Sequence, residues 1–216
     1  MTTSGNVDRA RVYRFLARTF LPPEASRVSE VKREDLPELS DALRRLGANA
    51  ELIALADQLN ACLVTADGSS LTAAYDRAFE VSNGAELPPN ETAHAPETPQ
   101  EGLTKTYELA DIAGFYRAFG LEVEPGGERV DHIAAELEFM HFLAVKEALA
   151  NERGETEKAE ICRDGAASFL SDHLGRWTSK LGAQLKSCDP MYQAAGEFLV
   201  QFVRLDMDDR EPQATS

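Results

Sequence analysis

The sequence predicts an all-α fold, a single helical bundle domain of about nine helices with a long Pro-rich loop in the middle. Three observations predict this fold. Apolar residues recur at intervals of three and four over most of the chain, which is the period of an amphipathic helix. No segment has the alternating pattern of a β-strand. Hydrophobic residues make up 43% of the 216 residues, which is enough for a substantial core.

The first helix is expected from about Val7 to Leu21. Pro22 and Pro23 end it, because proline lacks the amide hydrogen and clashes with the preceding turn. Residues 24–37 are expected to form a polar connection. A short helix follows and stops at Gly47. Its apolar residues are Leu39, Leu43 and Leu46.

Two more helices complete the N-terminal half. Asn49 is well placed to cap the first of them, since an asparagine side chain accepts a hydrogen bond from a free amide at a helix start. The turn 67–70 separates the two helices. The apolar positions at helical spacing are Leu52, Leu55, Ala56, Leu59 and Leu63 in the first, and Leu71, Tyr75, Ala78 and Phe79 in the second.

The loop 82–101 interrupts the helical pattern. It contains Pro88, Pro89, Pro96 and Pro99. A loop of this length inside a compact domain is unusual, and such loops are often functional. A simple linker or hinge between two helical halves explains the same composition, and length alone does not decide between the two.

The C-terminal half resumes with a helix over 103–119, which Gly120 ends. A long helix is expected from about Arg129 to Asn151. It carries two apolar rows, and apolar residues on two faces indicate a helix buried at the centre of the fold. The first row is Ile133, Leu137, Met140 and Ala144, and the second is Phe139, Phe142, Val145 and Leu149.

Two further helices follow. The next is expected from Glu155 to His173, with Gly175 as a candidate break. Asp189 and Pro190 form a capped start with proline at the first helical position of the last helix. The domain is therefore predicted to span 1–205, and the acidic tail 206–216 is predicted to be disordered. The residues expected to face inward before the candidate break are Ile161, Ala166, Phe169 and Leu170.

The formal net charge is -15. A nucleic-acid-binding protein needs a basic face, so this charge disfavours that class. An acidic surface suits a basic partner such as an arginine-bearing peptide, although it is equally explained by solubility alone. No apolar run is long enough to span a membrane, and no secretory signal is recognisable, so a cytoplasmic location is expected. Cys62, Cys162 and Cys188 are expected to be unpaired thiols.

No nucleophile, phosphate-binding or dinucleotide-binding motif is present in the sequence. One metal hypothesis requires a test, because di-iron bundles use a Glu-x-x-His pair on one helix face. Glu138 and His141 have this spacing on the long central helix. A second copy, Glu91 and His94, lies between prolines, where a continuous helix is not expected. A helical di-metal enzyme built on Glu138 and His141 is the rival from a different functional class.

The segment Glu128–His132 lies where a Gly-rich loop meets the long helix. Asp131 near the helix start favours the positive end of the helix dipole. His132 and Glu136 are four residues apart and share a face, so they are spaced for a hydrogen bond. With Glu91 and Asp131 expected at the surface, such a cluster suits a guanidinium or the backbone of a bound peptide. A capping motif without a ligand explains the same residues.

Several stretches resemble the TorD/DmsD/NarJ family of molybdoenzyme maturation chaperones. Glu128–His132 is similar to the family's E-x-P-D-H motif, and the following 133–143 resembles its ELEFM-x-x-L helix. Leu87–His94 resembles the upstream proline loop. The segments 109–121 and 13–17 are similar to two further helices of the family. Val130 departs from the family's proline, and Asn90 stands where relatives often have an aromatic residue.

The resemblance implies a chaperone without enzymatic activity and without a cofactor. Its partner would be the precursor of a molybdopterin-containing oxidoreductase, bound through a twin-arginine signal peptide or N-terminal segment and held until cofactor insertion and export. A NarJ-like assembly factor for a nitrate reductase subunit that is not exported is the alternative within the family. A monomer or a homodimer is expected, with 82–101 as the hinge of a domain-swapped form. The implied peptide-binding residues are Pro88, Pro89, Glu91, His94, Tyr116, Glu128, Asp131 and His132.

Overall fold

The computed structural model describes residues 3–79, 88–94, 101–122 and 128–210. Within these ranges the protein is all-α, with no strand. The helices are α1 (Thr3–Thr19), α2 (Ala25–Glu30), α3 (Leu36–Arg45), α4 (Ala50–Thr65), α5 (Gly68–Phe79), α6 (Glu101–Ala118), α7 (Ile133–Glu152), α8 (Thr156–Phe169), α9 (Gly175–Leu185) and α10 (Pro190–Arg210).

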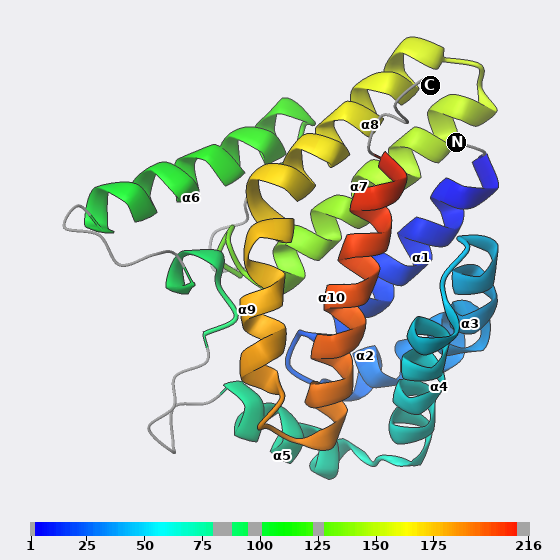
Figure 1. The fold of residues 1–216 in the computed structure, drawn as a ribbon, viewed down its shortest axis with the longest axis vertical. Coiled ribbons are helices and arrows are strands. Elements are labelled where there is room, and N and C mark those ends of the chain that lie inside the picture. The colour runs from blue at the N-terminus through cyan, green and yellow to red at the C-terminus, as the bar shows by residue number, and fades with distance from the viewer. Residues whose placement is uncertain (1–2, 80–87, 95–100, 123–127, 211–216) are drawn as a thin grey trace.

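Helix α7 occupies the centre of the bundle, where it packs against α1 on one side and α8 on the other. Helix α10 crosses this layer and contacts α9 and α4 (Figure 1). Helix α6 extends away from the bundle at one edge. The expectation of a centrally buried α7 is confirmed for its first apolar row, while Leu149 of the second row is 42% exposed. The all-α prediction is therefore correct.

Aromatic side chains fill the core between α1, α7 and α10. Tyr13 packs edge-on against Phe202 with ring centroids 5.0 Å apart, and Phe139 contacts Phe169 in the same way at 4.8 Å. Trp177 is 2% exposed. Such pairs stabilise a core beyond the area that they bury, because the edge of one ring is positive and the face of the other is negative.

A buried carboxylate joins the two ends of the described chain. Asp206 of α10 is 1% exposed and accepts hydrogen bonds from Arg9 Nε at 2.6 Å and from the Tyr13 hydroxyl at 2.6 Å. Its Oδ1 also lies 3.1 Å from Nε of Arg210. Burial alone would raise the pKa of Asp206, but the guanidinium groups of Arg210 and Arg9 lower it below its ordinary value. The carboxylate is therefore ionised and holds α1 against α10.

The local signals for helix ends are confirmed. Asn49 accepts a hydrogen bond from the amide of Leu52 at 2.8 Å, and Asp189 accepts one from Met191 at 3.0 Å. Gly47 has a φ of 77°, a conformation that only glycine adopts without strain, so α3 ends there. The three cysteines are free thiols. Among the described helices, none has the length and apolarity needed to cross a membrane.

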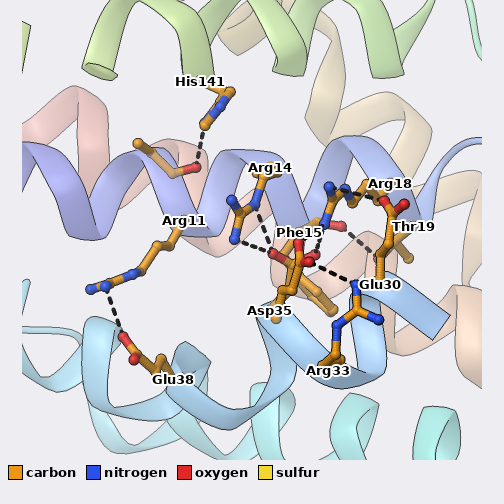
Figure 2. A network of polar contacts seen from close by, with 12 residues as sticks. Arg11, Arg14, Phe15, Arg18, Thr19, Glu30, Arg33, Asp35, Glu38 and His141 are labelled. Carbon is orange, nitrogen blue, oxygen red and sulfur yellow. Dashed lines mark hydrogen bonds and ion pairs between the residues drawn. The ribbon is translucent and has the colours of Figure 1, made fainter. Parts of the chain in front are cut away.

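The polar connection expected over 24–37 is wrong, because this segment is largely helical: α2, a π-helical turn Val31–Asp35 and the start of α3 run through it. Asp35 explains the difference. Its carboxylate is buried and accepts hydrogen bonds from Arg14 Nε at 2.8 Å and Arg18 Nη1 at 2.9 Å, both on α1 (Figure 2). This charge pairing joins residues 17 or more positions apart, so it fixes the segment although the local sequence pattern does not reveal it.

Two expectations for the C-terminal half are also corrected. Gly175 does not end the helical backbone, since a π-helical turn, Leu170–Leu174, joins α8 to α9, and the helix axis changes direction there (Figure 1). Ile161 is 55% exposed, because α8 turns a different face, with Ala159, Cys162, Ala166 and Phe169, toward the core.

The disordered tail predicted from Asp206 is wrong for residues 206–210, which are helical. Helix α10 continues to Arg210, because Asp206 and Arg210 are both held by the buried ion pairs described above. Residues 211–216 of the expected tail lie outside the described residues. The same applies to 82–87 and 95–100 of the expected hinge loop, of which only 88–94 is described.

Replacing Asp206 by Ala is expected to lower the free energy of unfolding by about 3–5 kcal/mol at pH 7, because the buried side chains of Arg9, Tyr13 and Arg210 lose a shared acceptor. Urea unfolding followed by circular dichroism measures this change. Asp208→Ala removes an exposed carboxylate from the same helix and is the control. Equal midpoints for the two variants would show that the Asp206 cluster does not stabilise the fold.

Candidate functional site

The proline segment 88–94 is seated on the N-terminal end of α7. The amide of Ile133 donates to the Pro89 carbonyl at 2.7 Å, and the amide of Glu91 donates to the Asp131 carbonyl at 2.8 Å. Asn90 and His132 form an isolated antiparallel bridge. The first amides of a helix lack partners within the helix, so the Pro89 carbonyl satisfies one of them. These bonds set the start of α7 at Ile133, later than the expected start at Arg129.

Asp131 is fully buried, and its carboxylate is hydrogen-bonded within this junction. Its carboxylate accepts hydrogen bonds from the Thr92 hydroxyl at 2.6 Å and from Arg129 Nε at 3.0 Å. The Asn90 side-chain amide donates to it at 3.2 Å, so this departure from the family pattern has a local role. A carboxylate that is 0% exposed cannot receive a peptide guanidinium without first losing these donors.

His132 caps α7. Its Nδ1 accepts a hydrogen bond from the amide of Ala134 at 3.1 Å. Burial lowers the pKa of His132, although Glu128 and Asp131 act in the opposite direction. A neutral imidazole keeps the lone pair that the cap requires. The expected hydrogen bond between the side chains of His132 and Glu136 is replaced by this cap and by a contact of Glu136 with Trp177.

A chain of buried polar groups continues inward from the seated segment. Glu91 Oε2 lies 3.1 Å from Nδ1 of His173, and the indole of Trp177 donates to Glu136 Oε2 at 3.0 Å. Oε1 of an ionised Glu136 has no donor among the described residues. Burial, followed by the charge of Glu91, holds the pKa of Glu136 well above its usual range. A protonated Glu136 donates a hydrogen bond to Glu91 and completes the chain.

His94 anchors the segment 88–94, and Tyr116 of α6 anchors the chain just before α7. Nε2 of His94 lies 3.1 Å from the Pro88 carbonyl, and the imidazole stacks on Trp177 with ring centroids 5.0 Å apart. The Tyr116 hydroxyl donates to the Val130 carbonyl at 2.8 Å. Pro88 and Pro89 are half-buried.

The structure therefore brings the eight predicted site residues to one region but not to one open surface. The expectation that Glu91 and Asp131 lie at the surface is wrong: their exposed fractions are 4% and 0%. The side chain of Glu128 is the most open of the predicted acidic groups, at 47%. Glu128 and Tyr116 also line the adjoining groove.

A groove with a volume of about 580 Å³ runs between α1 and α7, and Tyr116 of α6 also lines it. This volume is within the range of ligand-binding pockets. The sequence did not nominate this groove, because its walls come from helices that lie far apart in the chain. Its apolar lining consists of Ala17, Leu21, Tyr116, Leu121, Val130, Ala134, Ala135, Phe139 and Phe142.

The charged residues that line the groove are two arginines and three glutamates. Arg14 and Arg18 on α1 are both bonded to Asp35, as Figure 2 shows, and Arg18 also pairs with Glu30 at 3.2 Å. These arginines are therefore already neutralised. The glutamates are Glu122, Glu128 and Glu138.

The two Glu-x-x-His pairs lie apart and serve other contacts. His141 Nδ1 lies 2.8 Å from the Ala10 carbonyl, to which it donates its proton (Figure 2). Glu91 and His94 are held in the seated segment. Within the described part of the chain, no three metal-binding side chains are grouped as a metal site would require.

Comparisons with known proteins all indicate the same family. A family model described as "Nitrate reductase delta subunit" matches residues 33–182. The selenate reductase assembly chaperone protein of Thauera selenatis is 31% identical over 136 residues, 62% of this chain and 67% of that protein. The perchlorate reductase assembly chaperone protein of Dechloromonas aromatica is 32% identical over 116 residues, which cover 53% of this chain and 46% of that protein.

A third relative is the chaperone protein TorD of Photobacterium profundum, which is 35% identical over 110 residues. These residues cover 50% of this chain and 50% of that protein. The chain thus spans about half the length of two of these curated relatives and 67% of the first.

Replacing Asp131 by Ala is expected to destabilise the protein, at about 1–3 kcal/mol for each buried donor left without a partner. Thr92 supplies two such donors, its amide and its hydroxyl. Urea unfolding provides the measurement. Glu128→Ala, which removes an exposed carboxylate just upstream, is the matched control. A stable Asp131 variant would mean that the carboxylate is free to act on a ligand instead.

Replacing Glu136 by Gln is expected to stabilise the protein progressively as the pH rises above 4.5, the ordinary pKa of the carboxyl group. The folded-state pKa of Glu136 lies above the ordinary value of 4.5, so the folded protein retains a proton that the unfolded chain releases. Its stabilisation is complete below the unfolded pKa and is lost as the pH rises toward the folded pKa.

A glutamine amide donates to Glu91 at every pH, so the Glu136→Gln variant does not carry this loss. Urea unfolding of both proteins across the pH range gives the difference in stability, and Glu160→Gln on an exposed part of α8 serves as the control. A difference that does not change with pH would exclude a protonated Glu136.

Proposed function

The chain belongs to the nitrate reductase delta subunit family, the TorD/NarJ family of molybdoenzyme chaperones, and from this premise we propose that it is a system-specific chaperone for one molybdopterin oxidoreductase. It binds the twin-arginine signal peptide or N-terminus of the precursor in the cytoplasm. It assists cofactor insertion and assembly, and it delays export until the enzyme is complete. It performs no catalysis itself.

The groove between α1 and α7 is the observation that carries this proposal. A signal peptide offers arginine side chains followed by an apolar segment. The groove combines an apolar lining with glutamates at its edge, so both parts of such a peptide find matching chemistry. The net charge of -15 favours association with a basic segment.

The segment 88–94 helps to hold in place the residues that line the groove. Tyr116 and Val130 line the groove and are joined by the hydrogen bond described above. Asp131 and His132 fix the backbone next to this contact. The residues thus divide into two roles. We assign positioning of the groove to Pro88, Pro89, Glu91, His94, Asp131 and His132, and contact with the peptide to Tyr116 and Glu128.

A NarJ-like role for a subunit that is not exported is the second candidate, and the description of the matching family favours it. Such a partner has no twin-arginine motif. The same groove would then receive a different N-terminal segment, so the identity of the peptide separates the two roles.

Calorimetric titration with a synthetic peptide that bears two adjacent arginines and an apolar segment is expected to show binding, tighter than for the same peptide with two lysines. The reason is that a guanidinium binds a carboxylate through two parallel hydrogen bonds, whereas an ammonium acts as a point charge. Binding of neither peptide would contradict the signal-peptide role and favour the NarJ-like one.

A further inference from the structure

Two carboxylates that line the α1–α7 groove, those of Glu122 and Glu138, have no ion pair or side-chain hydrogen bond with another described residue. Glu138 stands on the helix that forms one wall of the groove, whereas Glu122 lies beyond the end of α6. By contrast, Glu128 lies 3.8 Å from Nε2 of His132, and Asp131 behind the groove is paired with an arginine. Glu138 is therefore the unpaired carboxylate that a helix holds in the groove.

Glu138 is exposed in the groove, so a ligand can reach its carboxylate. The apolar side chains of Phe139 and Phe142 line the groove with it. Burial by the surrounding protein raises the pKa of Glu138, whereas Arg27 and Arg18 lower it. Both arginines form their ion pairs with other carboxylates. A cation that enters the groove therefore meets an accessible, unpaired carboxylate beside apolar surface.

The charged residues that line the groove favour a ligand with a positive charge. Arg14 and Arg18 are neutralised by acidic partners outside the groove, whereas its glutamates are not neutralised by any described arginine or lysine. The lining contains three glutamates and two arginines, so its formal charge is negative. The apolar surface of Leu21, Leu121 and Phe142 adjoins these charges. An arginine followed by an apolar residue satisfies both features.

We propose that Glu138 binds an arginine guanidinium of the partner's N-terminal segment, while the apolar residues of that segment lie on Leu21, Leu121 and Phe142. The inference rests on the proposed function and assigns arginine recognition to a residue outside the E-x-P-D-H segment. Glu138 is exposed enough for a guanidinium to reach it in the folded protein, which Asp131 and Glu91 are not.

The test is a calorimetric titration of the full chain and its Glu138→Gln variant with the twin-arginine peptide and its twin-lysine counterpart. We expect Glu138→Gln to weaken binding of the arginine peptide about tenfold or more. It should weaken lysine-peptide binding less, so that the preference for arginine shrinks. Glu160→Gln on α8 changes the charge equally, away from the groove, and should leave both affinities within about twofold.

Each outcome has one meaning. If the wild-type protein binds the arginine peptide and Glu138→Gln binds it equally well, the assignment of Glu138 is overturned while the proposed function stands. Loss of affinity in Glu128→Gln alone would overturn it in the same way and move the contact to the loop. If the wild-type protein binds neither peptide, the proposed function and this inference both fail. Unfolding midpoints of the variants confirm that they are folded.

Discussion

The seating of the segment 88–94 on the N-terminal end of α7 is the constraint on which the architecture around the groove depends. Helix α7 contacts both α1 and α8, so its start position determines where the groove lies. That position is set by two backbone hydrogen bonds and by the buried carboxylate of Asp131. A carboxylate in the interior is tolerated only when donors surround it, so the Thr92 hydroxyl and the Arg129 guanidinium are obligatory partners.

Buried carboxylates organise the rest of the bundle in the same way. Asp35 holds α1 to the π-helical turn before α3, and Asp206 holds α1 to α10. Each of these carboxylates is paired with arginines, although acidic residues outnumber basic ones in this chain. The consequence reaches the groove, because Arg14 and Arg18 face it with their charges already compensated (Figure 2). The glutamates that line the groove therefore remain available to a cation although two arginines line it as well.

The residues that resemble the family motif thus fall into two groups. Asp131, His132 and Glu91 are buried and determine backbone geometry, whereas Glu128 and Tyr116 line the groove. The side-chain amide of Asn90 donates a hydrogen bond to Asp131. In our proposal, Glu138 on the exposed side of α7 recognises the arginine-bearing segment. Which of these residues line the groove depends on how the helices pack, which a sequence motif does not show.

The sequence by itself determined the all-α class, most helix boundaries and the family, because helical period, proline stops and caps such as Asn49 are local properties. It also placed the acidic motif at a helix start. Only the tertiary structure decided that 24–37 is helical, that Asp131 is buried and that α1 and α7 enclose a groove. Each of these depends on partners far apart in the chain, such as Arg14 with Asp35 or Thr92 with Asp131. The spacing of residues in the sequence does not show which charged side chain a carboxylate will contact once the helices have packed.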